Sequence, residues 1–367
     1  MEENTVPIQN TVEQPEIIDN KPRKIRIVLS VVGILLILFV ISLVVNSRTV
    51  KTGNIIQVTK NTITPSPTPF LFREVTIPYL RERFYKSSLG PLKIYSENQS
   101  YTSYLTSYNS DGLKINGLLT IPKGTNEKYP AIVFVHGYIP PNQYQTTERY
   151  TDYVDYLASN GFVVFKIDLR GHGNSEGEPS GAYYSSDYIV DTLNAYAALQ
   201  SASFVNSHKI GLWGHSMAGN VVMRSFASKP TIPAVVIWAG TVYSYNDFTK
   251  YKINDQSYQP PSMSTERVKK RQQLINTYGE PSSISAFWKL VAPTNYLSDL
   301  KGALEINHAV DDEVVNIGYS RDLMALLDKT TVPHEFYTYP TGGHNIEGAS
   351  FYQAMEHTVI FLKKYLE

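Results

Sequence analysis

The sequence predicts an α/β fold in which a mostly parallel sheet is covered by helices on both faces. From residue 131 onward, short apolar segments alternate with longer amphipathic ones, a pattern typical of parallel strands joined by crossover helices. The chain has 367 residues, of which 42% are hydrophobic and 18% charged, so it can bury a sizeable core. The alternation is interrupted once, at 241–293, where no convincing strand is found. We interpret this segment as a helical cap insertion, with a peripheral helical extension that does not contact substrate as the alternative.

The N-terminal region indicates a membrane anchor. Residues 27–45 are uncharged and strongly apolar, long enough to cross the ~30 Å hydrocarbon core as a helix. Four of the six residues before this run are basic, against two of the six after it. The positive-inside rule then places 1–26 in the cytoplasm as a tail. We expect an uncleaved signal anchor in the cell membrane; a cleaved signal peptide and a buried core helix are the alternatives.

The domain organisation beyond the anchor follows from composition. Residues 46–69 are rich in Pro, Thr and Ser and are predicted to form an extended linker. Residues 70–367 form the globular domain, which we expect to lie outside the cytoplasm and to begin with an antiparallel strand pair, 103–108 and 113–121, around a turn containing Gly112. Apolar runs predict later strands at 131–135, 162–167, 209–213, 234–239, 303–307 and 335–339. Amphipathic periodicity predicts helices at 148–159, 186–200, 220–227, 266–278, 317–328 and 351–366.

The most informative segment lies between the predicted strand 209–213 and the predicted helix 220–227. Ser216 stands there between Gly214 and Ala218, with Gly219 next. A serine on a sharp strand-to-helix turn is lifted out of the sheet, and small neighbours relieve the crowding. The helix N-terminus directs N–H groups at any charge that develops on the serine. Ala218 replaces the commoner glycine and is small enough for the pattern to hold. Ser216 is therefore the candidate nucleophile.

A serine hydroxyl needs a positioned base, and four histidines follow Ser216 in the chain. His344 lies in a glycine-containing turn just after the last predicted strand, which places an imidazole at the edge of the sheet where active sites form. His334 begins a strand and His357 lies within the last helix, so a structural role suits each better. His344 is the candidate base.

The base needs an acid that orients it, and the loop after strand 303–307 offers Asp311, Asp312 and Glu313. Their spacing from His308 favours Asp312, with Asp311 as the alternative. The chain order of serine, acid and histidine is the one expected for a nucleophile on a strand-to-helix turn.

Two backbone amides are candidate donors to an oxyanion. Met217 follows the nucleophile directly. Tyr138 lies in the tight turn after the first parallel strand. His136, just before this turn, precedes the nucleophile and is interpreted as a packing residue.

Composition excludes several other functions. The 33 basic and 33 acidic residues balance, which gives no basic footprint for nucleic acid. The chain has no cysteine, so thiol catalysis and thiolate metal sites are excluded. The glycine-rich segment 168–175 lacks the lysine and spacing of a phosphate-binding loop. We expect no cofactor and no catalytic metal.

Together these motifs resemble those of α/β-hydrolases of the prolyl oligopeptidase family of serine peptidases, in the branch of acylaminoacyl peptidases and dipeptidyl peptidases. The resemblance covers residues from about 75 to 367 and is carried by 136–138, 168–175, 214–219, 308–315 and 343–344. It implies a triad of Ser216, Asp312 and His344 with an oxyanion hole at Tyr138 and Met217. The large N-terminal propeller of those peptidases has no room here, which leaves peptide specificity open.

The sequence therefore predicts a membrane-anchored serine hydrolase of peptides or acylated peptides, with a carboxylesterase for small esters as the alternative. Five aromatic residues of the insertion favour small substrates by forming an apolar wall: Tyr243, Tyr245, Phe248, Tyr251 and Trp288. A non-catalytic surface binding protein that keeps the fold is the rival from another class.

Overall fold

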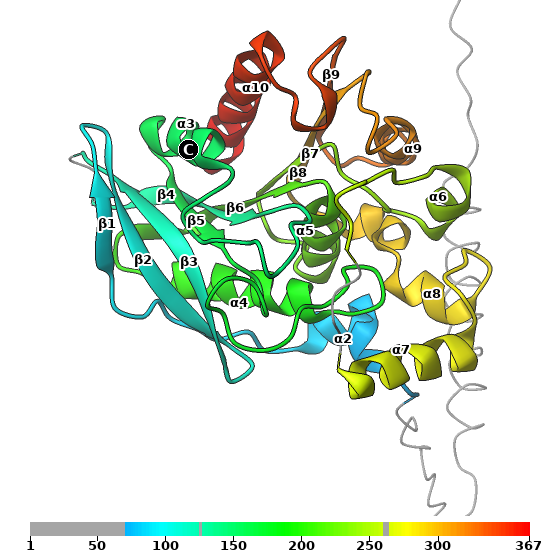
Figure 1. The fold of residues 1–367 in the computed structure, drawn as a ribbon. Coiled ribbons are helices and arrows are strands. Elements are labelled where there is room, and N and C mark those ends of the chain that lie inside the picture. The colour runs from blue at the N-terminus through cyan, green and yellow to red at the C-terminus, as the bar shows by residue number, and fades with distance from the viewer. Residues whose placement is uncertain (1–69, 125–126, 260–263) are drawn as a thin grey trace, which may run out of the picture. The chain divides into compact units, whose positions relative to one another are not determined.

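The centre of the computed structural model is a nine-stranded sheet (Figure 1). The structure describes residues 70–124, 127–259 and 264–367. The strands are β1 Lys93–Glu97, β2 Tyr101–Ser110, β3 Leu113–Pro122, β4 Tyr129–Val135, β5 Val163–Ile167, β6 Val205–His215, β7 Ala234–Trp238, β8 Ala303–Ala309 and β9 His334–Tyr339. Their order along the sheet is β1-β2-β3-β5-β4-β6-β7-β8-β9. The first three strands and the β3–β5 pair are antiparallel, and all other neighbours are parallel.

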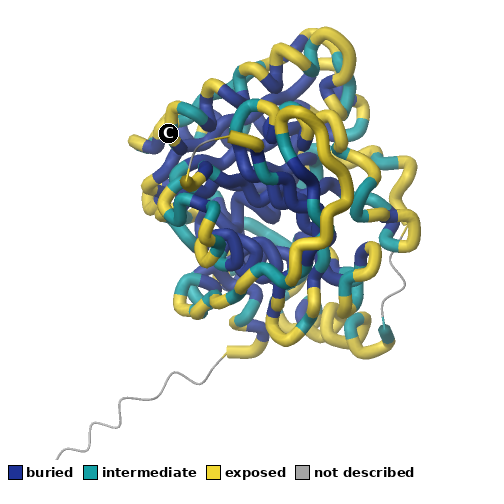
Figure 2. Tube along the Cα trace, turned by 90° about the vertical axis from the view of Figure 1, so that its left-hand side faces the viewer, coloured by how far each residue is buried: buried dark blue, intermediate teal, exposed yellow. Residues whose placement is uncertain are grey.

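Helices cover both faces of this sheet. They are α2 Ile77–Glu82, α3 Thr151–Ser159, α4 Asp187–Gln200, α5 Met217–Ser228, α6 Tyr245–Lys250, α7 Thr265–Tyr278, α8 Ala286–Val291, α9 Gly318–Leu327 and α10 Ala349–Leu366. Phe134 of β4 packs in one core cluster with α3 and α10, whereas its neighbour Val133 packs in another with α4, α5 and α9. Successive side chains of a strand point to opposite faces, so β4 is buried on both sides. Figure 2 shows the buried interior of the fold in dark blue.

The predicted α/β class, with a mostly parallel sheet between helices, is confirmed. Each strand predicted from the sequence overlaps an observed one, although β6 begins at Val205 rather than at 209. Helix α3 begins at Thr151 rather than at 148, because Arg149 and Tyr150 both have φ 56° in the left-handed region. The sequence did not indicate β1, whose five residues are all exposed and so show no apolar alternation, nor the short helices α2, α6 and α8.

The segment 241–293 lies between β7 and β8, and its described residues form α6, α7 and α8 (Figure 1). This is the helical insertion that the sequence predicted. An isolated bridge joins Ile253 of this segment to Val315, in the loop after β8. The insertion is thus tied to the carboxyl edge of the parallel strands.

The predicted membrane helix at 27–45, like the tail and the linker, lies outside the described residues and stays a prediction. Among the helices that the structure does describe, none combines the length and the apolar character needed to cross a bilayer.

Candidate active site

Ser216 occupies a sharp turn between β6 and α5. Its backbone has φ 56° and ψ −120°, a conformation that L-residues rarely adopt. The amide of Ser216 donates to the carbonyl of Trp238 in β7 at 2.9 Å, which fixes the turn against the neighbouring strand. Strain of this kind persists where the surrounding structure enforces it, as at active sites. The turn is the one that the sequence predicted.

Small residues around Ser216 are required by space. A Cβ at Gly214 would lie 2.8 Å from the carbonyl oxygen of Ala218, and a Cβ at Gly219 would lie 2.6 Å from the Cα of Gly240. Ala218 itself is fully buried, so its methyl group is accommodated within the core. The departure from glycine at this position therefore leaves the turn intact.

Asp312 and His344 are hydrogen-bonded to each other. His344 Nδ1–H donates to Asp312 Oδ2 at 2.8 Å. The other carboxylate oxygen, Oδ1, accepts from the amides of Val314 and Val315, both at 2.9 Å. Burial opposes ionisation of Asp312, but hydrogen bonds from His308 and His344 outweigh it and hold its pKa well below the ordinary value. The carboxylate is therefore ionised and the His344 ring is oriented with Nε2 turned away from Asp312.

His308 is a second histidine on the same carboxylate. It is fully buried; its Nε2 lies 3.1 Å from Asp312 Oδ2 and its Nδ1 lies 2.7 Å from Ser320 Oγ. Sequence reasoning used His308 only as a spacing marker and missed this contact. The signal was the i, i+4 spacing between His308 at the end of β8 and Asp312.

The competing candidates lie elsewhere. Asp311 accepts from the amides of Gly342 and Gly343 at 3.3 and 2.8 Å, so it holds the backbone of the turn before His344 and not its ring. His334 contacts Asp328, and His357 stacks on Tyr337. The structure thus brings Asp312, rather than Asp311, to His344.

The loop after β4 passes directly against Ser216. A Cβ at Gly137 would lie 3.1 Å from the Ser216 Cβ, and Tyr138 follows. Met217 is the first residue of α5, so its N–H is one of the first-turn amides that lack an intrahelical acceptor. Tyr138 and Met217, the two predicted oxyanion donors, line one cavity together with Ser216.

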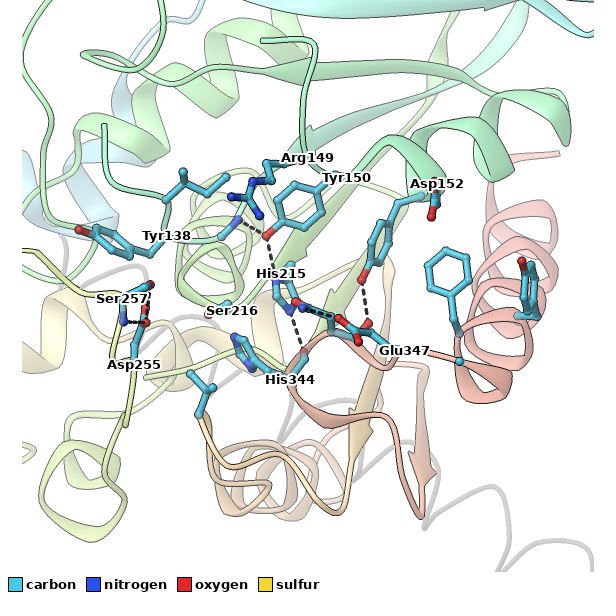
Figure 3. Close-up of a pocket in the computed structure, with 18 residues that line it drawn as sticks. Tyr138, Arg149, Tyr150, Asp152, His215, Ser216, Asp255, Ser257, His344 and Glu347 are labelled. Carbon is cyan, nitrogen blue, oxygen red and sulfur yellow. Dashed lines mark hydrogen bonds between the residues drawn. The ribbon is translucent and has the colours of Figure 1, made fainter. Parts of the chain in front are cut away.

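Two cavities meet at Ser216, and Figure 3 shows the residues that line one of them. The larger, of about 610 Å³, contains His344 and is lined at its rim by charged side chains that include Arg149, Asp152 and Glu347. The smaller, of about 380 Å³, is mainly apolar and contains Met217. Ser216, Tyr138 and Asp255 line both. The candidate base and nucleophile therefore line the same cavity.

The predicted aromatic wall is largely wrong. Tyr243, Tyr245 and Trp288 are almost completely buried: Tyr243 packs in the main core, and the other two pack in a smaller cluster that includes α8. Tyr251 packs on Tyr319. Of the five predicted residues, Phe248 lines the smaller cavity. The remaining aromatic lining comes from residues that sequence reasoning did not single out for this purpose: Tyr138, Tyr183, Tyr184 and Tyr258.

No group of three or more metal-binding side chains is found in the part of the chain that the structure describes. The chemistry that the site offers is that of its own hydroxyl, imidazole and carboxylate.

Comparisons with known proteins identify the family of the chain. The family described as "Serine aminopeptidase, S33" matches residues 126–348. A polyketide transferase of Penicillium crustosum is 27% identical over 144 residues, which are 39% of this chain and 46% of that protein. An uncharacterized peptidase of Bacillus subtilis is 23% identical over 253 residues, 68% of this chain and 88% of that protein. The chain thus matches less than half of the first relative and most of the second.

Solved structures share the fold. An acetyl xylan esterase from Thermoanaerobacterium aligns with a TM-score of 0.56 at 19% identity, covering 79% of this chain and 91% of the esterase. An acylaminoacyl peptidase from Pyrococcus horikoshii aligns with a TM-score of 0.56 at 17% identity, covering 74% of this chain and 42% of the peptidase. At these identities the likeness establishes the fold alone.

Proposed function

Because the chain belongs to the serine aminopeptidase S33 family and is a serine hydrolase, we propose that Ser216, His344 and Asp312 form its catalytic triad. The observation that carries the proposal is the 2.8 Å bond from His344 Nδ1 to Asp312 Oδ2, beside a cavity that Ser216 also lines. This bond leaves Nε2 of His344 free to accept the proton of the serine hydroxyl.

The reaction follows from these roles. Ser216 Oγ attacks the acyl carbonyl while His344 Nε2 takes its proton, and the amides of Tyr138 and Met217 stabilise the oxyanion. His344 then returns the proton to the leaving group, which departs and leaves an acyl-enzyme. Water, activated by His344, releases the acid and restores Ser216. Asp312 stabilises the imidazolium throughout by accepting from Nδ1–H.

We propose peptides or acylated peptides as substrates. The family description and the Bacillus subtilis relative support this choice. The alternative is a carboxylesterase for small esters, which is supported by the fold shared along 91% of the acetyl xylan esterase. Esters need less protonation of the leaving group than amides do, so ester hydrolysis should be measurable under either assignment.

The test is covalent labelling of the full-length chain with a fluorophosphonate probe. We expect labelling of the wild type and none of Ser216→Ala, because the probe reacts with an activated serine. Labelling that persists in Ser216→Ala would overturn the assigned nucleophile. Hydrolysis of p-nitrophenyl esters against aminoacyl p-nitroanilides then separates esterase from peptidase.

We further propose that 27–45 anchors the enzyme in the cell membrane as a single-pass helix, with the catalytic domain outside the cytoplasm. The apolar run and the four basic residues before it support this location. The linker 46–69 would hold the domain away from the lipid surface.

A further inference from the structure

A chain of three hydrogen bonds connects the loop after β4 to the loop that carries His344. The amide of Gly137 lies 2.9 Å from Tyr150 Oη, which lies 2.8 Å from His215 Nδ1. His215 Nε2 lies 2.9 Å from the carbonyl oxygen of His344. The close-up in Figure 3 shows this connection running past Ser216. It joins two segments of the site that are far apart in the sequence.

The direction of each bond is fixed by its ends. The Gly137 N–H can only donate and the His344 carbonyl can only accept. His215 therefore carries its proton on Nε2, and Nδ1 accepts from the Tyr150 hydroxyl. Burial, together with the nearby His344, lowers the pKa of His215 to about 3, so the ring stays neutral and this tautomer persists.

Both ends of this series of hydrogen bonds lie next to the residues of the proposed reaction. Gly137 immediately precedes Tyr138, whose amide is a proposed oxyanion donor, and its Cβ position lies 3.1 Å from the Ser216 Cβ. His344 is the proposed base. Its ring is tilted against that of His215, with the ring centroids 4.6 Å apart.

We propose that Tyr150 and His215 are positioning residues. Their hydrogen bonds form a bridge that holds two loops in place beside Ser216: the loop of Gly137 and Tyr138, and the loop of His344. This inference rests on the proposed function of Ser216, His344 and Tyr138. His215, the last residue of β6 and the one before the nucleophile, contacts both Tyr150 and the carbonyl of His344. We therefore assign a positioning role to the residue before Ser216.

Tyr150 is placed for this task by a strained turn. Arg149 and Tyr150 both have φ 56°, which is disfavoured for residues with a Cβ. The ammonium of Lys166, on β5, donates to the carbonyls of Glu148 at 2.7 Å and of Arg149 at 3.2 Å. Lys166 is only 1% exposed, and its hydrogen bonds to these carbonyls offset the free-energy cost of burying its ammonium group. The charge fixes the backbone in the conformation that presents the Tyr150 hydroxyl to Gly137.

The first test is Tyr150→Phe in the full-length chain. The matched control is Tyr156→Phe, on helix α3, which begins directly after Tyr150. Tyr156 lines neither cavity at Ser216. We expect Tyr150→Phe to lower kcat for an ester about tenfold or more with KM nearly unchanged. We expect Tyr156→Phe to resemble the wild type.

A second readout separates positioning from general loss of structure. Sulfur accepts hydrogen bonds poorly, so a thionoester draws less help from the oxyanion amides than its matched ester does. If the bridge positions those amides, Tyr150→Phe should lower the ester rate far more than the thionoester rate. An equal loss on both substrates together with a lowered melting temperature would show a structural role only and would overturn the inference.

Two variants of His215 test each end of the bridge separately. Gln at 215 can replace Nε2 and keep the bond to the His344 carbonyl, whereas Asn can replace Nδ1 and keep the bond to Tyr150. We expect His215→Gln to lower the ester-to-thionoester ratio, and His215→Asn to shift the acid limb of the pH–rate profile, which reports the base. Wild-type behaviour of both would overturn the inference, even if Tyr150→Phe failed to fold.

The two proposals fail in different ways. If Ser216→Ala keeps its hydrolytic activity, the assigned nucleophile is wrong. If Ser216→Ala is inactive while Tyr150→Phe matches Tyr156→Phe in rate and in substrate ratio, the nucleophile stands and the bridge is refuted.

Discussion

At the scale of single residues, the neighbouring acids Asp311 and Asp312 have different hydrogen-bond partners and different roles. Asp312 accepts from both His308 and His344 and from two backbone amides, whereas Asp311 holds the turn at Gly342 and Gly343. The sequence offered three acids after the strand, and the spacing from His308 favoured Asp312 with Asp311 as the alternative. It could not show the amide donors, because these depend on how the loop folds back onto the carboxylate.

Asp312→Asn should lower kcat/KM for ester hydrolysis by about 10³- to 10⁴-fold, since an amide at this position opposes the His344 tautomer that catalysis needs. Asp311→Asn keeps an acceptor for the backbone amides and should cost less than about tenfold. Steady-state rates of the two variants, measured side by side, check both expectations. A larger loss in Asp311→Asn than in Asp312→Asn would reverse the assignment.

At the scale of elements, β8 carries a buried carboxyl group in its centre. Glu305 Oε1 accepts from Asn307 Nδ2 at 2.6 Å and from Thr358 Oγ1 of α10 at 2.8 Å. Among the described residues, Glu305 Oε2 has no partner. Burial is the main cause that raises the pKa of Glu305 to about 8. The apolar residues around Glu305 predicted the strand, but nothing in the sequence indicated that the glutamate itself is buried.

This carboxyl group makes stability depend on pH. Between its unfolded value near 4.5 and its folded value near 8, the native state binds more protons than the unfolded state, so stability falls as pH rises through this window. The whole window corresponds to roughly 5 kcal/mol of folding free energy. Glu305→Gln cannot titrate and should lose most of that slope, as measured by thermal unfolding from pH 5 to 9. Parallel slopes for the variant and the wild type would contradict the raised pKa.

The elements also show where sequence patterns stop. Long apolar runs such as β4 and β7 were predictable because parallel strands buried on both faces read as continuous hydrophobic segments. Helices α6 and α8 were not, since each has six residues and too few turns to show periodicity. The same limit explains the aromatic residues of the insertion. Composition cannot distinguish a tyrosine packed in the core, such as Tyr243, from one that lines a cavity, such as Tyr258.

At the scale of the whole molecule, the resemblance to serine peptidases and the serine hydrolase class are both confirmed. The family match and the shared fold of the acylaminoacyl peptidase support them. The turn at Ser216 and the chain order of serine, acid and histidine made this predictable from the sequence. The sequence could not show that these residues lie close together in space, because Asp312 and His344 meet only in the folded sheet.

The proposed topology can be tested because the chain contains no cysteine. We expect a single cysteine introduced at exposed Gln99 to react in intact cells with a maleimide that cannot cross membranes. Asn10→Cys, in the predicted cytoplasmic tail, should react only after the cells are opened. Labelling of both positions in intact cells, or protection of Gln99→Cys alone, would contradict the proposed orientation.

Tyr138 and Ser216 stand on the boundary between the two cavities. A substrate bound across this boundary would be divided at its scissile bond, with the acyl half on one side and the departing half on the other. Each half then has its own chamber, so the first product can diffuse away while the second stays esterified to the enzyme. Under the proposed mechanism, water enters the emptied chamber and attacks the acyl-enzyme. The size of that chamber limits which nucleophile other than water could attack the acyl group.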